Sequence, residues 1–231
     1  MYRTITIVTI LTFLIGMLNC ACNNVQTKAS THYEFKKITG YIRYLDELKE
    51  LQAELTFKTD SAVAIKGAVK LNQYLLNYKQ LPKIGIQYRM LKRGIELDSS
   101  FQFSYEDLNG SIIEIPYRAE TFKDVQMITD GLSISKGAAI SWRGNALEGN
   151  DGMVLILSDE IGNNFSIHHA GITRGTKFEI NKSFTSGLSK GKGTLRIIRK
   201  KTTTQALYDN PEMVLINYEH YLKPIHFEIK E

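Results

Sequence analysis

Residues 101–115 read FQFSYEDLNGSIIEI, and they decide the fold class that we expect for the whole chain. Phe101, Phe103 and Tyr105 alternate with polar residues, which is the pattern of a strand that buries one face. An Asn-Gly pair, the dipeptide most typical of hairpin turns, follows at residues 109–110, and a second apolar run starts at Ile112. The stretch therefore predicts two antiparallel strands joined by a turn.

Alternation with the same period recurs at Leu51, Ala53, Leu55 and Phe57. Segment 44–53, YLDELKELQA, is an exception, because its Glu, Lys and Leu content favours a short helix. A turn between two strands is the alternative there, since Leu51 already belongs to the alternating set. Other strand-length segments bounded by turn residues are 63–71, 85–91, 132–135, 138–142, 153–159, 165–168, 178–180, 194–201, 214–218 and 225–229.

The spacing of these segments predicts an all-β chain with two consecutive β-sandwich domains. The first domain is expected at residues 33–122 and the second at residues 127–231. Short strands separated by turns in the second part are typical of an immunoglobulin-like or fibronectin-like sandwich, and Trp142 is its candidate core residue.

Composition sets limits on the partners of the chain. Its 231 residues are 43% hydrophobic and 23% charged, which is ordinary for a globular protein. The net charge of +5 is mild, because the 24 acidic residues are spread along the sequence. Such a charge permits weak attraction to anionic lipid or polysaccharide but is too small to indicate a nucleic-acid-binding protein.

The N-terminal residues have the features of a targeting segment. Arg3 precedes an uncharged apolar run over residues 5–18, which is shorter than the ~20 residues of a transmembrane helix. Such a run is typical of the apolar region of a signal peptide. It ends beside Cys20 and Cys22, the only two cysteines of the chain, which are too close in sequence to form a disulfide readily.

This arrangement resembles the signals of bacterial lipoproteins, and the Asn-rich segment after it resembles the Bacteroidetes type. The resemblance implies that residues 1–19 are a signal peptide, that a cysteine sulfur carries a diacylglyceryl group, and that residues 20–32 are a lipidated tether. Cys20 is the preferred attachment site because the apolar run ends next to it. Cys22, which follows the small residue Ala21, is the alternative.

The same resemblance implies an address in the cell envelope. Two acyl chains anchor a protein stably to a membrane leaflet. No acidic cluster of the kind that marks surface export in this family follows the cysteines, and no Asp follows them directly. The expected location is therefore the outer membrane, with the body facing the periplasm.

Two candidate surface features follow from the sequence. The basic residues Lys190, Lys192, Arg196, Arg199, Lys200 and Lys201 form a candidate patch for anionic head groups or acidic glycans. A charged edge strand that blocks sheet-to-sheet association is the alternative. Ser61, in Asp60-Ser61-Ala62, resembles the O-glycosylation motif of Bacteroidetes periplasmic proteins, with an ordinary turn as the alternative.

Motifs for catalysis and for cofactors are weak. Residues 187–191, GLSKG, match the letters of a nucleophile elbow, but the helix that must follow the serine is not predicted, so a turn is expected. His168 and His169 are neighbours in a predicted strand and point to opposite faces, which argues against zinc. The loops at 148–151 and 159–164 carry oxygen ligands suited to calcium, although turns are rich in such residues anyway. No cofactor is expected.

Two classes of function stay open. The first is a non-catalytic envelope lipoprotein that binds a protein or a glycan, or has a structural role. The second is an envelope hydrolase that acts on glycan or peptidoglycan through the loop carboxylates Glu148, Asp151, Asp159 and Glu160. A hydrolase of this kind requires two carboxylates ~5–10 Å apart in a groove.

Overall fold

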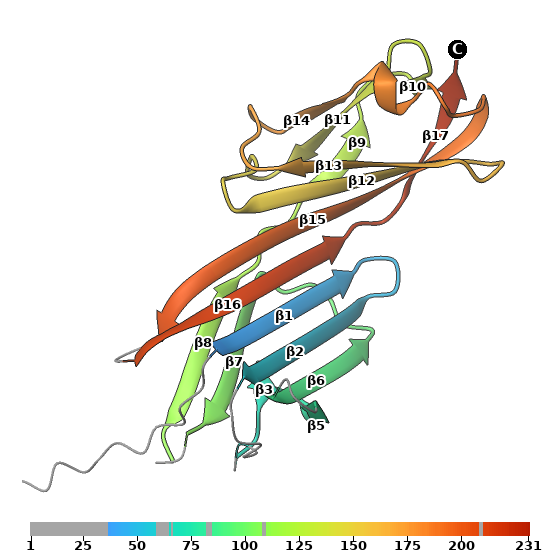
Figure 1. Ribbon diagram of the computed structural model, residues 1–231. Coiled ribbons are helices and arrows are strands. Elements are labelled where there is room, and N and C mark those ends of the chain that lie inside the picture. Colours follow the sequence, from blue (N-terminus) through green and yellow to red (C-terminus); the bar gives the residue numbers. More distant parts are fainter. Residues whose placement is uncertain (1–36, 59–64, 66, 82–84, 108–109, 208–209) are drawn as a thin grey trace, which may run out of the picture. The chain divides into compact units, whose positions relative to one another are not determined.

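The computed structural model describes residues 37–58, 65, 67–81, 85–107, 110–207 and 210–231, although not the side chains of residues 210–212. All of them belong to one compact unit, Tyr33–Glu231. The unit is all-β, as the sequence predicts (Figure 1). Its one helical element among these residues is the 3₁₀ turn η1 (Lys182–Phe184), so none of the described helices is long enough to cross a membrane.

The strands form one long sheet and two smaller ones. The long sheet has ten strands, eight of them in the order β10 (Leu132–Ser133), β17 (Ile225–Lys230), β15 (Gly191–Leu207), β16 (Asn210–Tyr221), β1 (Lys37–Leu45), β2 (Glu50–Lys58), β6 (Gly85–Arg93) and β5 (Asn77–Leu81). The other two are β12 (Asp151–Asp159), which pairs with β15, and β13 (Asn164–Ala170), which pairs with β12. The four-stranded sheet has the order β4 (Tyr74–Leu75), β3 (Lys70–Leu71), β7 (Ser100–Glu106) and β8 (Ile112–Arg118). The three-stranded sheet has the order β14 (Lys177–Ile180), β11 (Ala138–Arg143) and β9 (Lys123–Met127).

The first hydrophobic core lies between the long sheet and the four-stranded sheet. The predicted hairpin is confirmed as β7 and β8, with Phe103 opposite Ile115. Phe57 of β2 is fully buried and packs edge-on against Tyr105 of β7, with ring centroids 5.0 Å apart. The alternating apolar residues of β1, β2, β6 and β16 supply the opposite wall of this core.

The second hydrophobic core lies between the other end of the long sheet and the three-stranded sheet. Leu155 of β12 and Leu195 of β15 are fully buried in it. Trp142 belongs to this core, as predicted: its ring lies 4.7 Å from that of Phe122, and its Nε1 donates a hydrogen bond to the carbonyl of Asn145. Two β-sandwich cores are thus present.

The two cores are not consecutive in the sequence. Strand β15 pairs with β12 over residues 193–201 and with β16 over residues 198–207, so one strand contributes to both cores (Figure 1). Strand β16 then pairs in parallel with β1, and its Val214, Ile216 and Tyr218 are buried in the first core. The expected second domain, residues 127–231, therefore supplies part of the first core as well as most of the second. The second core also takes in Phe122 and strand β9, which begin before residue 127.

The expected helix at residues 44–53 is wrong, and the alternative of a turn between two strands is confirmed. Strands β1 and β2 pair in register from Lys37–Lys58 to Leu45–Glu50. Lys49 adopts a φ of 46°, and its N–H donates to the carbonyl of Asp46, which closes the turn. Burial of alternate residues on β2 outweighs the helix propensity of this segment, because each buried apolar side chain contributes more than a few tenths of a kcal/mol of propensity.

Candidate binding face of the long sheet

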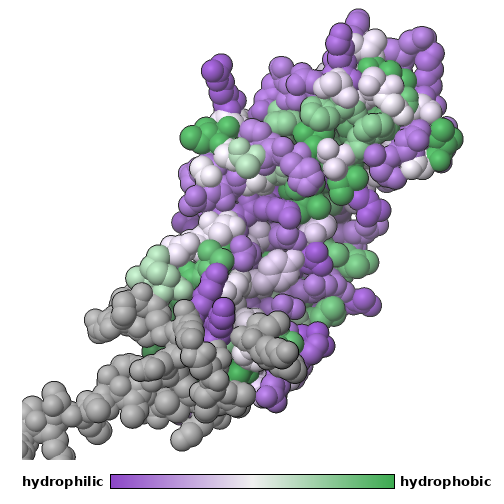
Figure 2. Space-filling view, in the orientation of Figure 1, coloured by the Kyte–Doolittle hydropathy of each residue, from purple (hydrophilic) through white to green (hydrophobic). Residues whose placement is uncertain are grey.

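One face of the long sheet packs on the first core, and its other face is open to solvent. On β1, Ile38 and Ile42 point into the core, whereas Tyr41 and Arg43 lie on the outer face and are only partly buried. Seen from the side of β1, β2 and β16, the surface over these strands is largely hydrophilic (Figure 2). We refer to this surface, from β15 across to β5, as the outer face.

Four side chains of the outer face form a tyrosine–arginine cluster, which consists of Tyr41, Arg43, Glu219 and Tyr221. The Arg43 guanidinium lies over the Tyr221 ring, 4.7 Å from its centroid, and 5.9 Å from that of Tyr41. Its Nη2 donates to the Tyr221 hydroxyl at 2.8 Å. Both tyrosine hydroxyls donate to Oε2 of Glu219, at 2.8 and 3.0 Å, and Lys200 Nζ lies 2.8 Å from Oε1. Every member is thus held in place by hydrogen bonds or stacking with other members.

The surroundings of Glu219 and Tyr41 fix the protonation state of each side chain at neutral pH. Burial raises the pKa of the Glu219 carboxyl, but hydrogen bonds from Lys200, Tyr41 and Tyr221 outweigh this effect and hold the pKa below its ordinary value. Burial and the neighbouring Glu219 carboxylate raise the pKa of Tyr41 well above that of a free phenol. Glu219 is therefore ionised, and Tyr41 keeps its proton as a donor.

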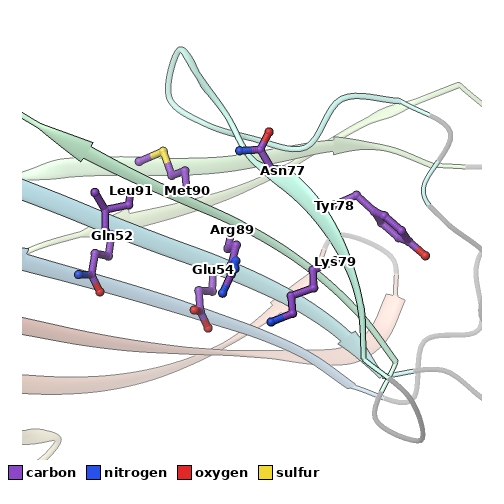
Figure 3. Close-up of a pocket in the computed structure, with 8 residues that line it drawn as sticks. All are labelled: Gln52, Glu54, Asn77, Tyr78, Lys79, Arg89, Met90 and Leu91. Atoms are coloured by element: carbon purple, nitrogen blue, oxygen red, sulfur yellow. The ribbon is translucent and has the colours of Figure 1, made fainter.

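A groove continues the outer face beside the cluster. It has a volume of about 600 Å³ and is lined by residues of β2, β5 and β6, including Gln52, Glu54, Lys79 and Arg89. Figure 3 shows the side chains of Glu54, Arg89 and Lys79 on one side of the strands, whereas Tyr78 points away from them. Gln52 and Glu54 lie directly opposite Arg43 and Tyr41 on the neighbouring strand, so the groove and the cluster adjoin.

The six basic residues predicted as one patch do not share one surface. Lys190, Lys192, Arg196 and Lys200 are exposed. Arg199 and Lys201 instead point to the opposite face of β15, where the Arg199 side chain has no exposed surface. The alternative of an edge strand is also wrong, because β15 pairs on both sides, with β12 and with β16 and β17. Strand alternation separates neighbouring cations, so the six cannot act together.

Arg199 belongs to a buried ionic cluster between the two cores. Its Nη2 lies 3.0 Å from Oε2 of Glu120 and 3.1 Å from Oδ2 of Asp151, and its guanidinium stacks on Phe122 at 4.8 Å. Lys201 also donates to Glu120, at 3.1 Å. Burial acts to raise the pKa of Glu120, but the hydrogen bond and charge of Lys201 outweigh it and lower the pKa.

The four loop carboxylates considered for hydrolysis lie at two separate places. Asp151 and Asp159 are the first and last residues of β12, so about 26 Å of extended chain separates their backbones. That distance is several times the ~5–10 Å required of an acid and base pair. Glu148 lies near Asp151, and Glu160 follows Asp159. Asp151 is already engaged by Lys201, and Asp159 by the backbone N–H of Ser189.

Asp159 holds a loop together. Its two carboxylate oxygens accept hydrogen bonds from the backbone N–H groups of Ile161, Asn163 and Ser189 and from the Asn163 side chain. Burial raises the pKa of this carboxyl, yet the donated hydrogen bonds prevail and lower it to about 2. A carboxylate with so low a pKa is a poor general acid near neutral pH.

The remaining candidate motifs have structural roles. Ser189 follows a short turn and precedes β15, so the strand–turn–helix context of a nucleophile elbow is absent here. His168 is exposed on β13, whereas His169 packs against Phe178, which confirms that they point to opposite faces. Across the described parts of the chain, no group of three or more His, Cys, Asp or Glu side chains is arranged to hold a metal ion.

Three predicted sites, Cys20, Cys22 and Ser61, lie outside the described residues, as do the signal peptide and the tether. The tyrosine–arginine cluster, in contrast, was missed by the sequence analysis. Its signal is the alternation of residues 38–44, in which Tyr41 and Arg43 occupy the polar positions. The sequence offers no sign that Glu219, 178 positions after Tyr41, completes the cluster.

Comparison with known proteins identifies no family. No family model matches the chain, and no curated protein matches it. One similar solved structure is a tetra-tandem repeat in the extending region of a large adhesion protein, with 13% identity and a TM-score of 0.29 over 80% of this chain and 49% of that one. This chain thus spans about half the length of that structure.

A second similar structure is the IG1+IG2 portion of DIP-gamma. It shares 8% identity with a TM-score of 0.24, over 84% of this chain and 95% of that one. At these TM-scores neither similarity carries an argument about the function of this chain.

Proposed function

We propose that this chain is a lipid-anchored protein of the bacterial cell envelope whose all-β body is a non-catalytic binding module. The observation that carries the binding role is the tyrosine–arginine cluster on the outer face. Tyr and Arg dominate the residues that contribute most to protein recognition sites. Side chains that are already ordered lose little conformational entropy when a ligand binds.

The lipid anchor rests on the sequence features around Cys20 and Cys22. An anchored body on the periplasmic side of the outer membrane would hold its binding face near envelope proteins and glycans. The hydrolase alternative has no comparable support, because Asp151 and Asp159 stand at opposite ends of one strand and are each engaged by other groups.

Metabolic labelling with an alkyne-tagged fatty acid tests the anchor. The full chain is expected to carry the label, Cys20→Ser to lose it, and Cys22→Ser to keep it. Loss of the label only in Cys22→Ser would assign the alternative attachment site. An unlabelled full chain would contradict the anchor.

Cross-linking in cells tests the binding role. A photo-reactive benzoylphenylalanine in place of Gln52, next to the tyrosine–arginine cluster, is expected to give a cross-linked envelope product. The same residue in place of the exposed Arg174, in the loop between β13 and β14, is the control and should give none. Absence of any product at position 52 would argue against a binding face.

A further inference from the structure

We propose that the outer face binds an uncharged polysaccharide that lies across the strands, from β15 to β5. This inference rests on the proposed binding role and names the class of ligand. The face is continuous, carries hydrogen-bonding groups along its length and has charges of both signs.

The face is continuous because strand pairing aligns its side chains in rows. One row runs through Lys200, Glu219, Arg43, Gln52 and Leu91, each opposite the next on the neighbouring strand. The adjacent row runs through Thr202, Asn217, Tyr41, Glu54, Arg89 and Asn77. At a spacing of about 4.8 Å between strands, the first row crosses five strands and is about 19 Å long, and the second crosses six and is about 24 Å long. Both lengths suit a chain of several sugar rings.

The second row can both donate and accept hydrogen bonds. Thr202, Asn217 and Asn77 have side chains that do both, and Glu54 and Arg89 stand opposite each other as acceptor and donor. A sugar hydroxyl also donates and accepts. A row of such mixed groups therefore matches a polyhydroxylated chain better than it matches an apolar ligand.

The charges of the face favour an uncharged ligand. Glu219 lies between Lys200 and Arg43, and Glu54 faces Arg89 and accepts a hydrogen bond from Gln87 at 3.0 Å. An acidic glycan across the two rows would meet two carboxylates. A cationic ligand would meet the three basic side chains of the rows and Lys79 of the groove. A charged ligand of either sign would therefore lie against side chains of its own charge as well as of the opposite charge.

The form of the face also fits a chain-like ligand. The groove at β2, β5 and β6 has a volume of about 600 Å³, and its lining residues Gln52 and Glu54 stand opposite Arg43 and Tyr41 of the cluster, so a ligand could extend from one to the other. Leu91, with 53% of its surface exposed, adds an apolar patch at the end of the first row. The C–H face of a sugar ring can pack on such a patch while its hydroxyls bind the polar groups.

Affinity electrophoresis of the full chain tests the ligand class. The probe is total envelope polysaccharide from the cells that make the protein, separated by anion exchange into an uncharged and an acidic fraction. Retardation by the uncharged fraction is expected to persist in 1 M salt. The variants Gln52→Ala and Arg89→Ala are expected to weaken it at least tenfold, whereas the control Arg174→Ala should leave it unchanged.

Several outcomes separate this inference from the proposed function. Retardation only by the acidic fraction, or no retardation by either, overturns the uncharged glycan. A cross-linked product at position 52 whose size periodate leaves unchanged, and in which peptides of a second protein are found by mass spectrometry, would identify a protein partner. The binding role would then stand, and the glycan would be excluded. No retardation together with no cross-link would overturn both. Circular dichroism of each variant checks that it is folded.

Discussion

Arg199 and Asp151 form an ion pair from which water is excluded: Nη2 lies 3.1 Å from Oδ2, and neither side chain has any exposed surface. The pair joins β15 to β12 at the point where β15 passes from one core to the other. A buried ion pair contributes little net stability compared with an apolar pair, but a single buried charge without its partner is strongly unfavourable. Substitution of one residue of the pair therefore tests how the two cores are connected.

Replacement of one partner is expected to destabilise the fold. Arg199→Met leaves Asp151 buried without its closest cation and should lower the free energy of unfolding by about 3–5 kcal/mol. Urea denaturation followed by circular dichroism measures the change. The matched control is Arg196→Met on the exposed face of the same strand, which should change stability by no more than about 0.5 kcal/mol. Equal effects of the two variants would contradict the buried pair.

Residues 33–122 alone are expected not to fold. That range lacks β16, whose Val214, Ile216 and Tyr218 line the first core, and it leaves one edge of β1 without its partner. Circular dichroism and amide hydrogen exchange compare this fragment with residues 33–231, and the fragment is expected to show little strand signal and little protection of its amides. A cooperatively folded fragment would show instead that the N-terminal range is an independent domain.

A point substitution tests the same packing in the full-length chain. Ile216→Ala should lower the free energy of unfolding by about 2–5 kcal/mol, because it opens a cavity beneath β1. Met213→Ala, on the same strand but with 52% of its surface exposed, is the control and should have a small effect. A similar loss in the free energy of unfolding for both variants would mean that β16 does not pack in the first core.

The two cores are expected to unfold together. Trp142 is the only tryptophan of the chain and reports on the second core, whereas most tyrosines of the buried set lie in the first. Since β15 contributes to both cores, tryptophan fluorescence and far-ultraviolet circular dichroism should give one coincident urea transition. Two separated midpoints would indicate that the cores are independent.

The loop held by Asp159 should respond to acid. Its pKa is about 2 in the folded chain and about 3.9 in an unfolded one, so the ionised form stabilises the fold. This contribution is complete above the unfolded value and is lost as the pH falls through the folded value. The melting temperature of Asp159→Asn should lie below that of the parent chain at pH 6, and the gap should narrow from pH 4 to pH 2. A gap that is independent of pH would contradict the role of the carboxylate.

Much of the local structure could be predicted from the sequence. The alternation in residues 101–105 and 51–57 indicated strands, and the structure has β7 and β2 there. Trp142 was correctly expected in a core. The strand β1 was missed, because Gly40 and the polar residues between its buried positions weaken the apolar signal over residues 37–45.

The candidate site was far less predictable. Sequence proximity suggested that Arg199, Lys200 and Lys201 act together, yet the pleat of β15 sends Lys200 to the outer face and the other two inward. The cluster that the outer face does carry combines β1 with β16. Its members come together only because β16 pairs with β1 across most of the chain.

The all-β class and the buried side of most strands follow from the sequence alone, because alternation of period two is a local property of the backbone and of the side chains that it carries. Which strands are neighbours, in contrast, depends on the tertiary structure. Pairing of β1 with β16 depends on apolar burial summed over residues far apart in the chain, which no local pattern encodes. The tyrosine–arginine cluster is a consequence of the pairing of β1 with β16, and the buried Arg199–Asp151 pair of the pairing of β15 with β12.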